Sequence, residues 1–174
     1  MGRARVARDA EPERVTIRRA GVNDLGLVRT LWEESAREIA AHRQTPWKWG
    51  WEDVEPRLGH AAVFLAEAGG TPAGFAIASR SRPDIGHLDD LYVRPAYRRH
   101  GVAVAILREL ARAFHERGVE HVSLDVDAGN QPARTLYENL GFVRYADRLY
   151  VGVSALEGTL ARRLTARPRG RPSR

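Results

Sequence analysis

Hydrophobic and polar residues alternate with a period of two in several short stretches of the chain, a pattern typical of β-strands. VTIRRA, from Val15, is the first such stretch, whereas AAVFLAEA, PAGFAIASR and HLDDLYV are strand candidates because turn signals bound them. The turn signals Gly69-Gly70 and SRPD separate these three, so we expect them to pair as antiparallel neighbours. HVSLDV predicts a fifth strand, and FVRYADRLYVGVSAL predicts two more, joined near Ala146-Asp147.

Other stretches repeat apolar residues every three or four positions, which predicts amphipathic helices. The first is LGLVRTLWEESAREIAAHR, with Asn23 or Asp24 as the expected cap. Residues 102–117 predict a second helix that ends at Gly118. The expected inner face of the first helix is Leu27, Leu31, Ser35 and Ile39, and that of the second is Ala103, Leu107, Leu110 and Phe114.

Three shorter helices complete the pattern. WEDVEPRLGH precedes the second strand, and a helix from Gln131 to Leu140 follows the cap residue Asn130. SALEGTLARRL has capping-box spacing between Ser154 and Glu157. The order of all elements predicts an α/β (α+β) fold, with a mostly antiparallel mixed sheet of about seven strands flanked by about four helices.

Composition narrows the domain organisation and the class of protein. With 174 residues, 43% of them hydrophobic, the chain is expected to form one domain over 14–161 between a flexible segment, 1–13, and an Arg-rich tail, 162–174. Three arginines in residues 1–8 and six in the tail account for the net charge of +6, and the stretch between them carries −3. A nucleic-acid-binding face on the folded part is therefore not indicated, although the tail alone could bind RNA or an acidic partner.

The absence of certain residues and segments excludes several functions. The chain has no cysteine, which excludes disulfides, thiolate metal sites and a cysteine nucleophile, and its six histidines show no metal-ligand spacing. No apolar run approaches the ~20 residues that span a bilayer, and no secretory signal is evident. We expect a cytoplasmic protein without a bound metal.

The turn RRHGVA, Arg98 to Ala103, directly precedes the second long helix. A helix start offers backbone N–H groups and a positive dipole end to an anion, and a glycine allows close approach. The nucleoside-triphosphate loop needs GxxxxGK, but the only lysine is Lys48, and the dinucleotide fingerprint GxGxxG is also absent. The turn therefore predicts either a phosphate cradle of another kind or an ordinary helix start with solvated arginines.

The surrounding residues favour the cradle. LDDLYVRPAYRRHGVAVAIL, followed by a strand and NQPARTLYENLGF, resembles the GNAT superfamily of acyl-CoA-dependent N-acyltransferases. The family's turn of Gln or Arg, two residues, Gly, one residue, then Gly or Ala is matched, and so is its downstream Asn-to-Tyr pattern. The matching positions are Arg98, Gly101 and Ala103 in the turn, and Asn130, Ala133, Leu136, Tyr137, Gly141 and Phe142 downstream. Arg99 stands where the family often has glycine.

The resemblance implies acetyl-CoA, or another acyl-CoA, as the donor. Its pyrophosphate would bind the amides from His100 to Ala103, and its pantetheine arm would lie along LYV, where the sheet must splay after Val93. The cofactor-binding residues expected on this basis are Leu91, Tyr92, Val93, Arg98, Arg99, His100, Gly101, Val102, Ala103, Asn130 and Tyr137.

Acetyl transfer needs a base to deprotonate the amine and an acid to protonate the leaving thiolate. Tyr137 matches the family's position for the acid, with packing on the helix as the alternative. Asp89 matches a carboxylate of several amine-acetylating members and is the favoured base, with Asp90 as the alternative. Regular strand geometry places Asp89 on one face with His87 and Leu91, and Asp90 on the other, so the two carboxylates should not share a site.

The acceptor is expected to be a primary amine of a small molecule or a protein, bound by the N-terminal half. Trp47 and Trp49, with Glu33, are candidate acceptor-binding residues, because aromatic and acidic groups suit a cationic amine. The alternative is that the tryptophans, Trp51 included, fill the core. The sequence thus predicts an N-acetyltransferase working through a ternary complex, as a monomer or homodimer, with a non-catalytic acyl-CoA-binding regulatory module as the second reading.

Overall fold

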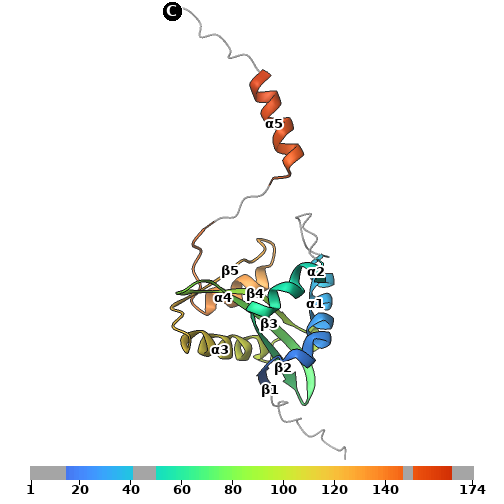
Figure 1. Cartoon of the computed structure of the whole chain (residues 1–174), viewed down its shortest axis with the longest axis vertical. Coiled ribbons are helices and arrows are strands. Elements are labelled where there is room, and N and C mark those ends of the chain that lie inside the picture. Colours follow the sequence, from blue (N-terminus) through green and yellow to red (C-terminus); the bar gives the residue numbers. More distant parts are fainter. Residues whose placement is uncertain (1–14, 41–49, 147–150, 166–174) are drawn as a thin grey trace, which may run out of the picture. The chain divides into compact units, whose positions relative to one another are not determined.

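The computed structural model describes residues 15–40, 50–146 and 151–165, with side chains described as far as residue 160. Within the chain two compact units are distinguished, Met1–Gln131 and Pro132–Arg174 (Figure 1). In the described parts of the chain, no helix combines the length and the apolar character needed to cross a bilayer. The single domain expected from the sequence stays a prediction.

The first unit contains the sheet and the helices packed on it. Its elements are β1 (Val15–Arg19), the 3₁₀ turn η1 (Val22–Asp24), α1 (Leu25–Ala40), α2 (Trp51–Val54), η2 (Glu55–His60), β2 (Ala62–Ala68), β3 (Thr71–Arg82), β4 (Ile85–Val93), η3 (Pro95–Tyr97), α3 (Val102–His115) and β5 (His121–Leu124). From the second unit the structure describes α4 (Gln131–Asn139), which begins at the boundary, and α5 (Val153–Thr165).

The five strands form one sheet in their order along the chain, β1-β2-β3-β4-β5. The first four pair antiparallel, whereas β5 runs parallel to β4 after the α3 crossover (Figure 1). The mixed, mostly antiparallel sheet expected from the sequence is confirmed. The difference is in the strand count, because the described residues form five strands rather than about seven.

The missing strands were expected at the C-terminal end. Residues 141–146 contain no strand, and 151–152 lie outside any element, while 147–150 fall outside the described residues. Val143 is 84% exposed and Tyr145 is 98% exposed, so the apolar positions of this alternating stretch bury little surface. Alternation without a packing partner does not make a strand, because β-propensity reflects packing on a neighbouring surface.

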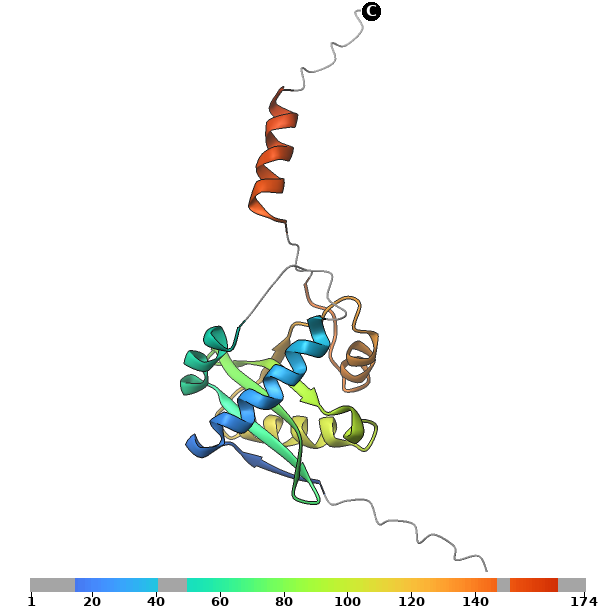
Figure 2. The same ribbon diagram turned by 90° about the vertical axis from the view of Figure 1, so that its right-hand side faces the viewer.

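The two faces of the sheet are covered by different helices, α1 with α2 on one and α3 on the other (Figure 2). On the first face Trp32 of α1 packs against Trp51 of α2, with ring centroids 5.9 Å apart. These rings belong to a core cluster that also holds Val28, Leu31, Val54, Leu65, Phe75, Ile77 and Tyr92. The core role considered for Trp51 is therefore confirmed.

The start and inner face of α1 differ slightly from the prediction. Gly21 caps the η1 turn before α1, and its N–H donates to Asp24 Oδ2 at 2.7 Å, so neither Asn23 nor Asp24 is the N-cap. Of the expected inner face, Leu31 and Ser35 are buried, whereas Leu27 is half-buried and Ile39 is 39% exposed. The buried residues of α1 are Val28, Leu31, Trp32 and Ser35.

On the opposite face α3 packs closely on β4. A Cβ added to Gly86 would lie 2.4 Å from the Phe114 ring, so the glycine leaves the space that this ring fills. Gly118 has φ +71° after the helix, as expected for its end. The buried residues of α3 are Val102, Ile106, Leu107, Leu110 and Phe114.

Candidate active site

A β-bulge in β4 determines where the two adjacent carboxylates point. Along the β3–β4 ladder Ile77 pairs with Asp90 but Ala78 pairs with Leu88, so Asp89 is the extra residue of the bulge. Residues opposite each other in an antiparallel pair share a face. Asp90 therefore shares the α1 face with Ile77, and Asp89 lines the same pocket.

The expectation that the two carboxylates lie on opposite faces is wrong. It assumed uninterrupted alternation along β4, and the one-residue bulge breaks it. Leu88 and Leu91 face α3, opposite Ala78 and Ala76, whereas both aspartates face the pocket. The grouping of Asp89 with Leu91 fails for the same reason.

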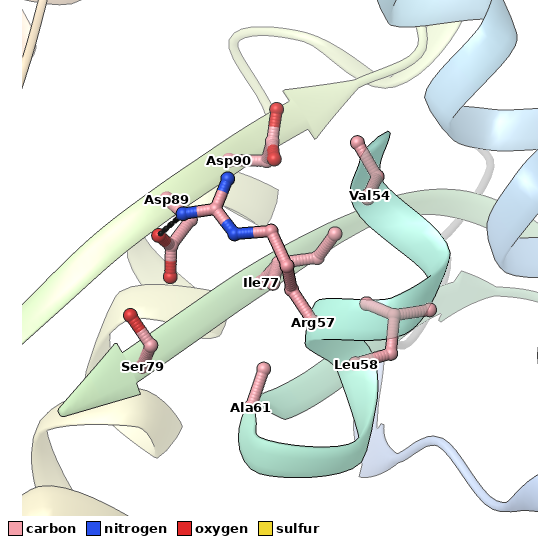
Figure 3. A pocket seen from close by; sticks show the side chains of 8 residues that line it. All are labelled: Val54, Arg57, Leu58, Ala61, Ile77, Ser79, Asp89 and Asp90. Carbon is pink, nitrogen blue, oxygen red and sulfur yellow. Dashed lines mark ion pairs between the residues drawn. The ribbon is translucent and has the colours of Figure 1, made fainter. Parts of the chain in front are cut away.

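The pocket lies between η2 and the sheet (Figure 3). Figure 3 shows the Arg57 side chain reaching from η2 toward the two carboxylates, above an apolar wall. The residues that line the pocket are Val54, Arg57, Leu58, Ala61, Ile77, Ser79, Asp89 and Asp90. Acidic, basic and apolar side chains thus lie close together in this pocket.

The two oxygens of the Asp89 carboxylate lie in different environments. Its Oδ1 lies 3.7 Å from Arg57 Nη2, which is an ion pair longer than a hydrogen bond. Its Oδ2 is buried and has no hydrogen-bond partner among the described residues. The side chain is only 15% exposed. A buried carboxylate oxygen without a donor is costly and is expected to have a function.

The sheet opens beside this carboxylate. β4 pairs with β5 only from Ile85 to Leu88, and beyond Leu88 its recorded pairing is with β3 alone. The splay expected after Val93 thus begins five residues earlier, at the bulge. The backbone of Leu91, Tyr92 and Val93 lies along the open edge, where an extended amide-containing chain could pair as another strand would.

The turn between β4 and α3 has the geometry of an anion cradle. Arg99 adopts φ +65° and Gly101 φ +78°, both in the left-handed region. A Cβ on Gly101 would meet no atom within 4 Å, so its surroundings are open. Ala105 N–H donates to Gly101 O at 2.9 Å and closes the first turn of α3, which leaves the amides of Val102 and Ala103 ahead of the helical ladder.

The two arginines of this turn differ in what they contact. Arg98 Nε donates to Val93 O at 2.8 Å and Nη2 donates to Glu38 Oε2 at 2.7 Å. Its guanidinium also lies over the Tyr92 ring, 5.8 Å from the centroid. Hydrogen bonding to Glu38 raises the pKa of Arg98. Arg98 thus joins α1, β4 and the turn, while Arg99 and His100 are exposed.

A second ion pair, one helical turn away from Glu38, joins α1 to the residue that follows β4. Arg94 Nε and Nη2 donate to the two carboxylate oxygens of Glu34, each at 2.8 Å, and Nη1 donates to Pro72 O. This hydrogen bonding lowers the pKa of Glu34. The sequence offered no signal for either pair, because each joins residues 60 positions apart.

Tyr137 belongs to the second unit, on α4. Its ring packs edge-on against Phe142, with centroids 5.5 Å apart. Burial raises the pKa of the phenol to about 12, so the hydroxyl stays protonated at neutral pH. A protonated phenol can donate a hydrogen bond to sulfur.

The remaining candidates are less informative. Glu33 accepts a hydrogen bond from Arg29 on the same helix at 2.8 Å, and its side chain is 45% exposed. Trp47 and Trp49 lie outside the described residues. Asn130 precedes α4, and its N–H donates to Asp127 O.

Arg57 was not predicted from the sequence as a site residue, because only the fold brings it to Asp89. Its position in a short helix beside acidic residues gave no signal of that contact.

The chain is similar to acetyltransferases in sequence and in fold. It is 33% identical to mycothiol acetyltransferase of Thermomonospora curvata over 141 residues, which is 78% of this chain and 46% of the relative. It is 34% identical to mycothiol acetyltransferase of Thermobispora bispora, over 64% of this chain and 41% of the relative. The chain therefore spans about half the length of these curated relatives.

Solved structures agree on the fold. The ribosomal-protein-S18-alanine N-acetyltransferase of Escherichia coli has a TM-score of 0.64 at 26% identity, covering 82% of this chain and 87% of that one. The structure of AAC(6')-Iy in complex with a bisubstrate analog, CoA-S-monomethyl-acetylneamine, also has a TM-score of 0.64, at 20% identity over 80% of this chain and 97% of that one. The family model described as "Acetyltransferase (GNAT) family" matches residues 27–142, and the chain belongs to that family.

Proposed function

We propose that the chain is an N-acetyltransferase that transfers an acetyl group from acetyl-CoA to a primary amine in a ternary complex. The observation that carries the proposal is the buried, unpartnered Asp89 Oδ2 at the bulge where β4 leaves β5. From this strand the chain continues through η3 into the open turn before α3. A proton acceptor at one end of this open strand edge suits the acceptor amine. The anion cradle at its other end suits the pyrophosphate of CoA.

The donor is held by this chain's backbone and by Arg99. The amides from His100 to Ala103 bind the pyrophosphate, and the exposed Arg99 guanidinium adds charge-assisted hydrogen bonds. The exposed edge at Leu91 and Val93 pairs with the pantetheine amides. Arg98 positions the turn rather than contacting phosphate, because its guanidinium already binds Val93 O and Glu38.

Asp89 supplies the base. An alkyl ammonium with a pKa near ~10 must lose a proton before its nitrogen can attack the thioester carbonyl carbon. Asp89 Oδ2 takes that proton, directly or through water, and passes it to solvent. The new C–N bond then forms, the C–S bond breaks, and the nitrogen's second proton ends on the CoA sulfur. The products are the neutral amide, the CoA thiol and one released proton.

Tyr137 supplies a hydrogen-bond donor to the sulfur of the leaving thiolate. With its pKa raised to about 12, the phenol is a weaker acid than a thiol, whose pKa is about 8.5. Its main contribution is therefore a hydrogen bond that strengthens as negative charge develops on sulfur. If Tyr137 transfers its proton to the sulfur completely, the phenol must take up a proton from the amine nitrogen in exchange.

The acceptor is a cationic primary amine. The names of the similar proteins cover mycothiol, an acetylneamine analog and the alanine of a ribosomal protein, so they include small-molecule and protein acceptors. The pocket's two carboxylates and apolar wall support a small alkyl amine for this chain.

An acceptor-dependent thiol-release assay tests the proposal. Purified protein is incubated with acetyl-CoA and a panel of alkyl amines, amino sugars and peptide N-termini, and free CoA thiol is followed with a thiol reagent, with product mass as confirmation. We expect release that depends on both the amine and the protein. Tight CoA binding without acceptor-dependent release would instead support the non-catalytic acyl-CoA-binding module.

A further inference from the structure

The turn before α3 contains a residue in a costly backbone conformation. Arg99 adopts φ +65° and Gly101 adopts φ +78°. The left-handed region is open to glycine but costs free energy for arginine, so Arg99 keeps this conformation only because neighbouring contacts fix the chain. Arg98, the residue directly before it, makes contacts of this kind with both its backbone and its side chain.

The backbone of Arg98 is held on both sides. Its N–H donates to Pro95 O at 3.3 Å, in the η3 turn that follows β4. Its carbonyl oxygen accepts a hydrogen bond from His100 Nδ1 at 2.7 Å, across the strained residue. A displacement of Arg98 therefore displaces the turn as well.

The Arg98 side chain also contacts the open edge of β4. Arg94 N–H donates to Ala73 O on β3, so the N–H and C=O groups of Val93 point away from β3. Arg98 Nε donates to this Val93 O at 2.8 Å. The turn is thus connected to the strand edge along which the pantetheine arm is proposed to lie.

The outer end of the Arg98 guanidinium is bound by Glu38 of α1. Nη2 donates to Glu38 Oε2 at 2.7 Å, and the guanidinium lies over the Tyr92 ring. The two side chains are 39% and 38% exposed, and an ion pair this exposed contributes little to the stability of the fold. The guanidinium is planar, however, so a second partner restricts it to one orientation.

We propose that Glu38 is a positioning residue for the donor, which acts through Arg98 to hold the turn from Arg99 to Ala103 in the conformation that binds the pyrophosphate. This inference rests on the proposed function. A turn that is ordered before the donor arrives lowers the conformational entropy that binding costs. Helix α1 thereby contributes to the affinity for the donor without touching it.

A binding experiment tests the role of Glu38 without catalysis. CoA, and pantetheine, which lacks the pyrophosphate, are titrated into the parent and into Glu38→Gln. We expect the Kd for CoA to rise roughly two- to five-fold in the variant, as for the loss of one half-exposed ion pair, while the Kd for pantetheine stays nearly unchanged. Removing an acidic charge by itself favours the binding of a polyanion, so charge alone predicts the opposite change.

A double-mutant cycle tests whether Glu38 acts through Arg98. Arg98→Met should raise the Kd for CoA more than Glu38→Gln does, because it also removes the contact with Val93 O. Adding Glu38→Gln to Arg98→Met should raise the Kd no further.

Glu34→Gln is the matched control on the same helix. Glu34 accepts two hydrogen bonds from Arg94, each at 2.8 Å, and Arg94 lies before η3 rather than in the turn. We expect this variant to have a lower melting temperature than Glu38→Gln, with the Kd for CoA within about two-fold of that of the parent. A Kd that rises as much in Glu34→Gln as in Glu38→Gln would show a general structural effect and overturn the proposal.

The order of the turn can also be measured without a ligand. In ¹⁵N relaxation-dispersion experiments, the amides from Arg99 to Ala103 should show more exchange in Glu38→Gln than in the parent. Unchanged relaxation would overturn the proposal, as would an unchanged or lower Kd for CoA, an equal rise for pantetheine, or a rise that persists in the Arg98→Met background.

These measurements separate the inference from the proposed function. A parent protein that binds CoA but acetylates no amine would contradict the proposed function, while the titrations and the relaxation data would still decide the role of Glu38. A parent protein that does not bind CoA would overturn both.

Discussion

Asp89 and Tyr137 divide the expected proton chemistry between two environments. The carboxylate lies in the pocket with an unpartnered oxygen, and the half-buried phenol has a raised pKa. Burial disfavours the charged form of a phenol, so Tyr137 remains a donor over the working pH range. The two side chains therefore suit opposite tasks.

Replacing Asp89 with asparagine removes the base but keeps the shape of the side chain. We expect kcat with an alkyl amine to fall on the order of 10²-fold or more, with acetyl-CoA binding nearly unchanged. Initial rates and isothermal titration with CoA measure the two quantities. Asp84→Asn is the matched control, since this exposed aspartate lies in the turn before the same strand. Equal rates for parent and Asp89→Asn would exclude Asp89 as the base.

Replacing Tyr137 with phenylalanine removes only the hydroxyl. We expect kcat to fall about ten- to a hundred-fold while the affinity for CoA changes little. Because the pKa is raised to about 12, ionisation of Tyr137 should cause no loss of activity in the parent below about pH 10. The rate as a function of pH checks both statements. Tyr145→Phe, at a 98% exposed position, serves as the control, and a Tyr137→Phe enzyme with full kcat would contradict the role.

At the scale of elements, α3 has a left-handed glycine at each end. Gly101 precedes the helix with φ +78° and Gly118 follows it with φ +71°, and a Cβ on either would meet no atom within 4 Å. The two positions are strained alike by a side chain, but only Gly101 lies in the expected phosphate cradle. Substitutions at the two glycines can therefore separate an effect on the stability of the fold from an effect on the binding of acetyl-CoA.

Changing either glycine to alanine should lower the free energy of unfolding by about 1 kcal/mol, because L-residues are disfavoured at positive φ. Only Gly101→Ala should also raise the KM for acetyl-CoA, through the methyl group added to the cradle. Urea unfolding and initial rates measure the two effects. If Gly118→Ala raises that KM equally, the cradle is not at the start of α3.

The elements show what sequence patterns can and cannot predict. Alternation predicted β1 and β5, turn signals bounded β2, β3 and β4, and the four-residue spacing with Gly118 predicted α3, because each of these signals is local in the sequence. The bulge at Asp89 was not predictable from β4 alone, since it is defined by the pairing with Ile77 and Ala78. Nor was the Arg98 contact with Glu38, which follows from the packing of α1 beside the turn.

At the scale of the whole molecule, Arg18 links three elements of the first unit. Its guanidinium pairs with Asp24 at 2.8 Å, at the start of α1, and with Glu67 of β2 at 2.9 Å. Hydrogen bonding to Arg18 lowers the pKa of Asp24 from 3.8 to about 2. A carboxylate with a lowered pKa stabilises the fold above its unfolded pKa, and that stabilisation is lost as the pH falls through about 2.

The Asp24→Asn variant should therefore be less stable than the parent at pH 7, with the difference shrinking between about pH 4 and pH 2. Thermal unfolding across this pH range measures the effect. Glu116→Gln provides the comparison, because its ion pair with Arg112 is exposed and joins residues only four positions apart at the end of α3. A difference that is constant with pH would show that the Asp24 carboxylate acts through shape rather than charge.

The bulge in β4 also makes the pocket sensitive to chain length and not only to side-chain identity. Deleting Asp89 is expected to remove this bulge, so that Leu88 and Asp90 become neighbours opposite Ala78 and Ile77, without changing any residue of the core cluster around Phe75 and Ile77. Such a shortened protein keeps one carboxylate, Asp90, opposite Ile77. A one-residue insertion or deletion at this position is therefore expected to change which carboxylates line the pocket while the order of the strands stays the same.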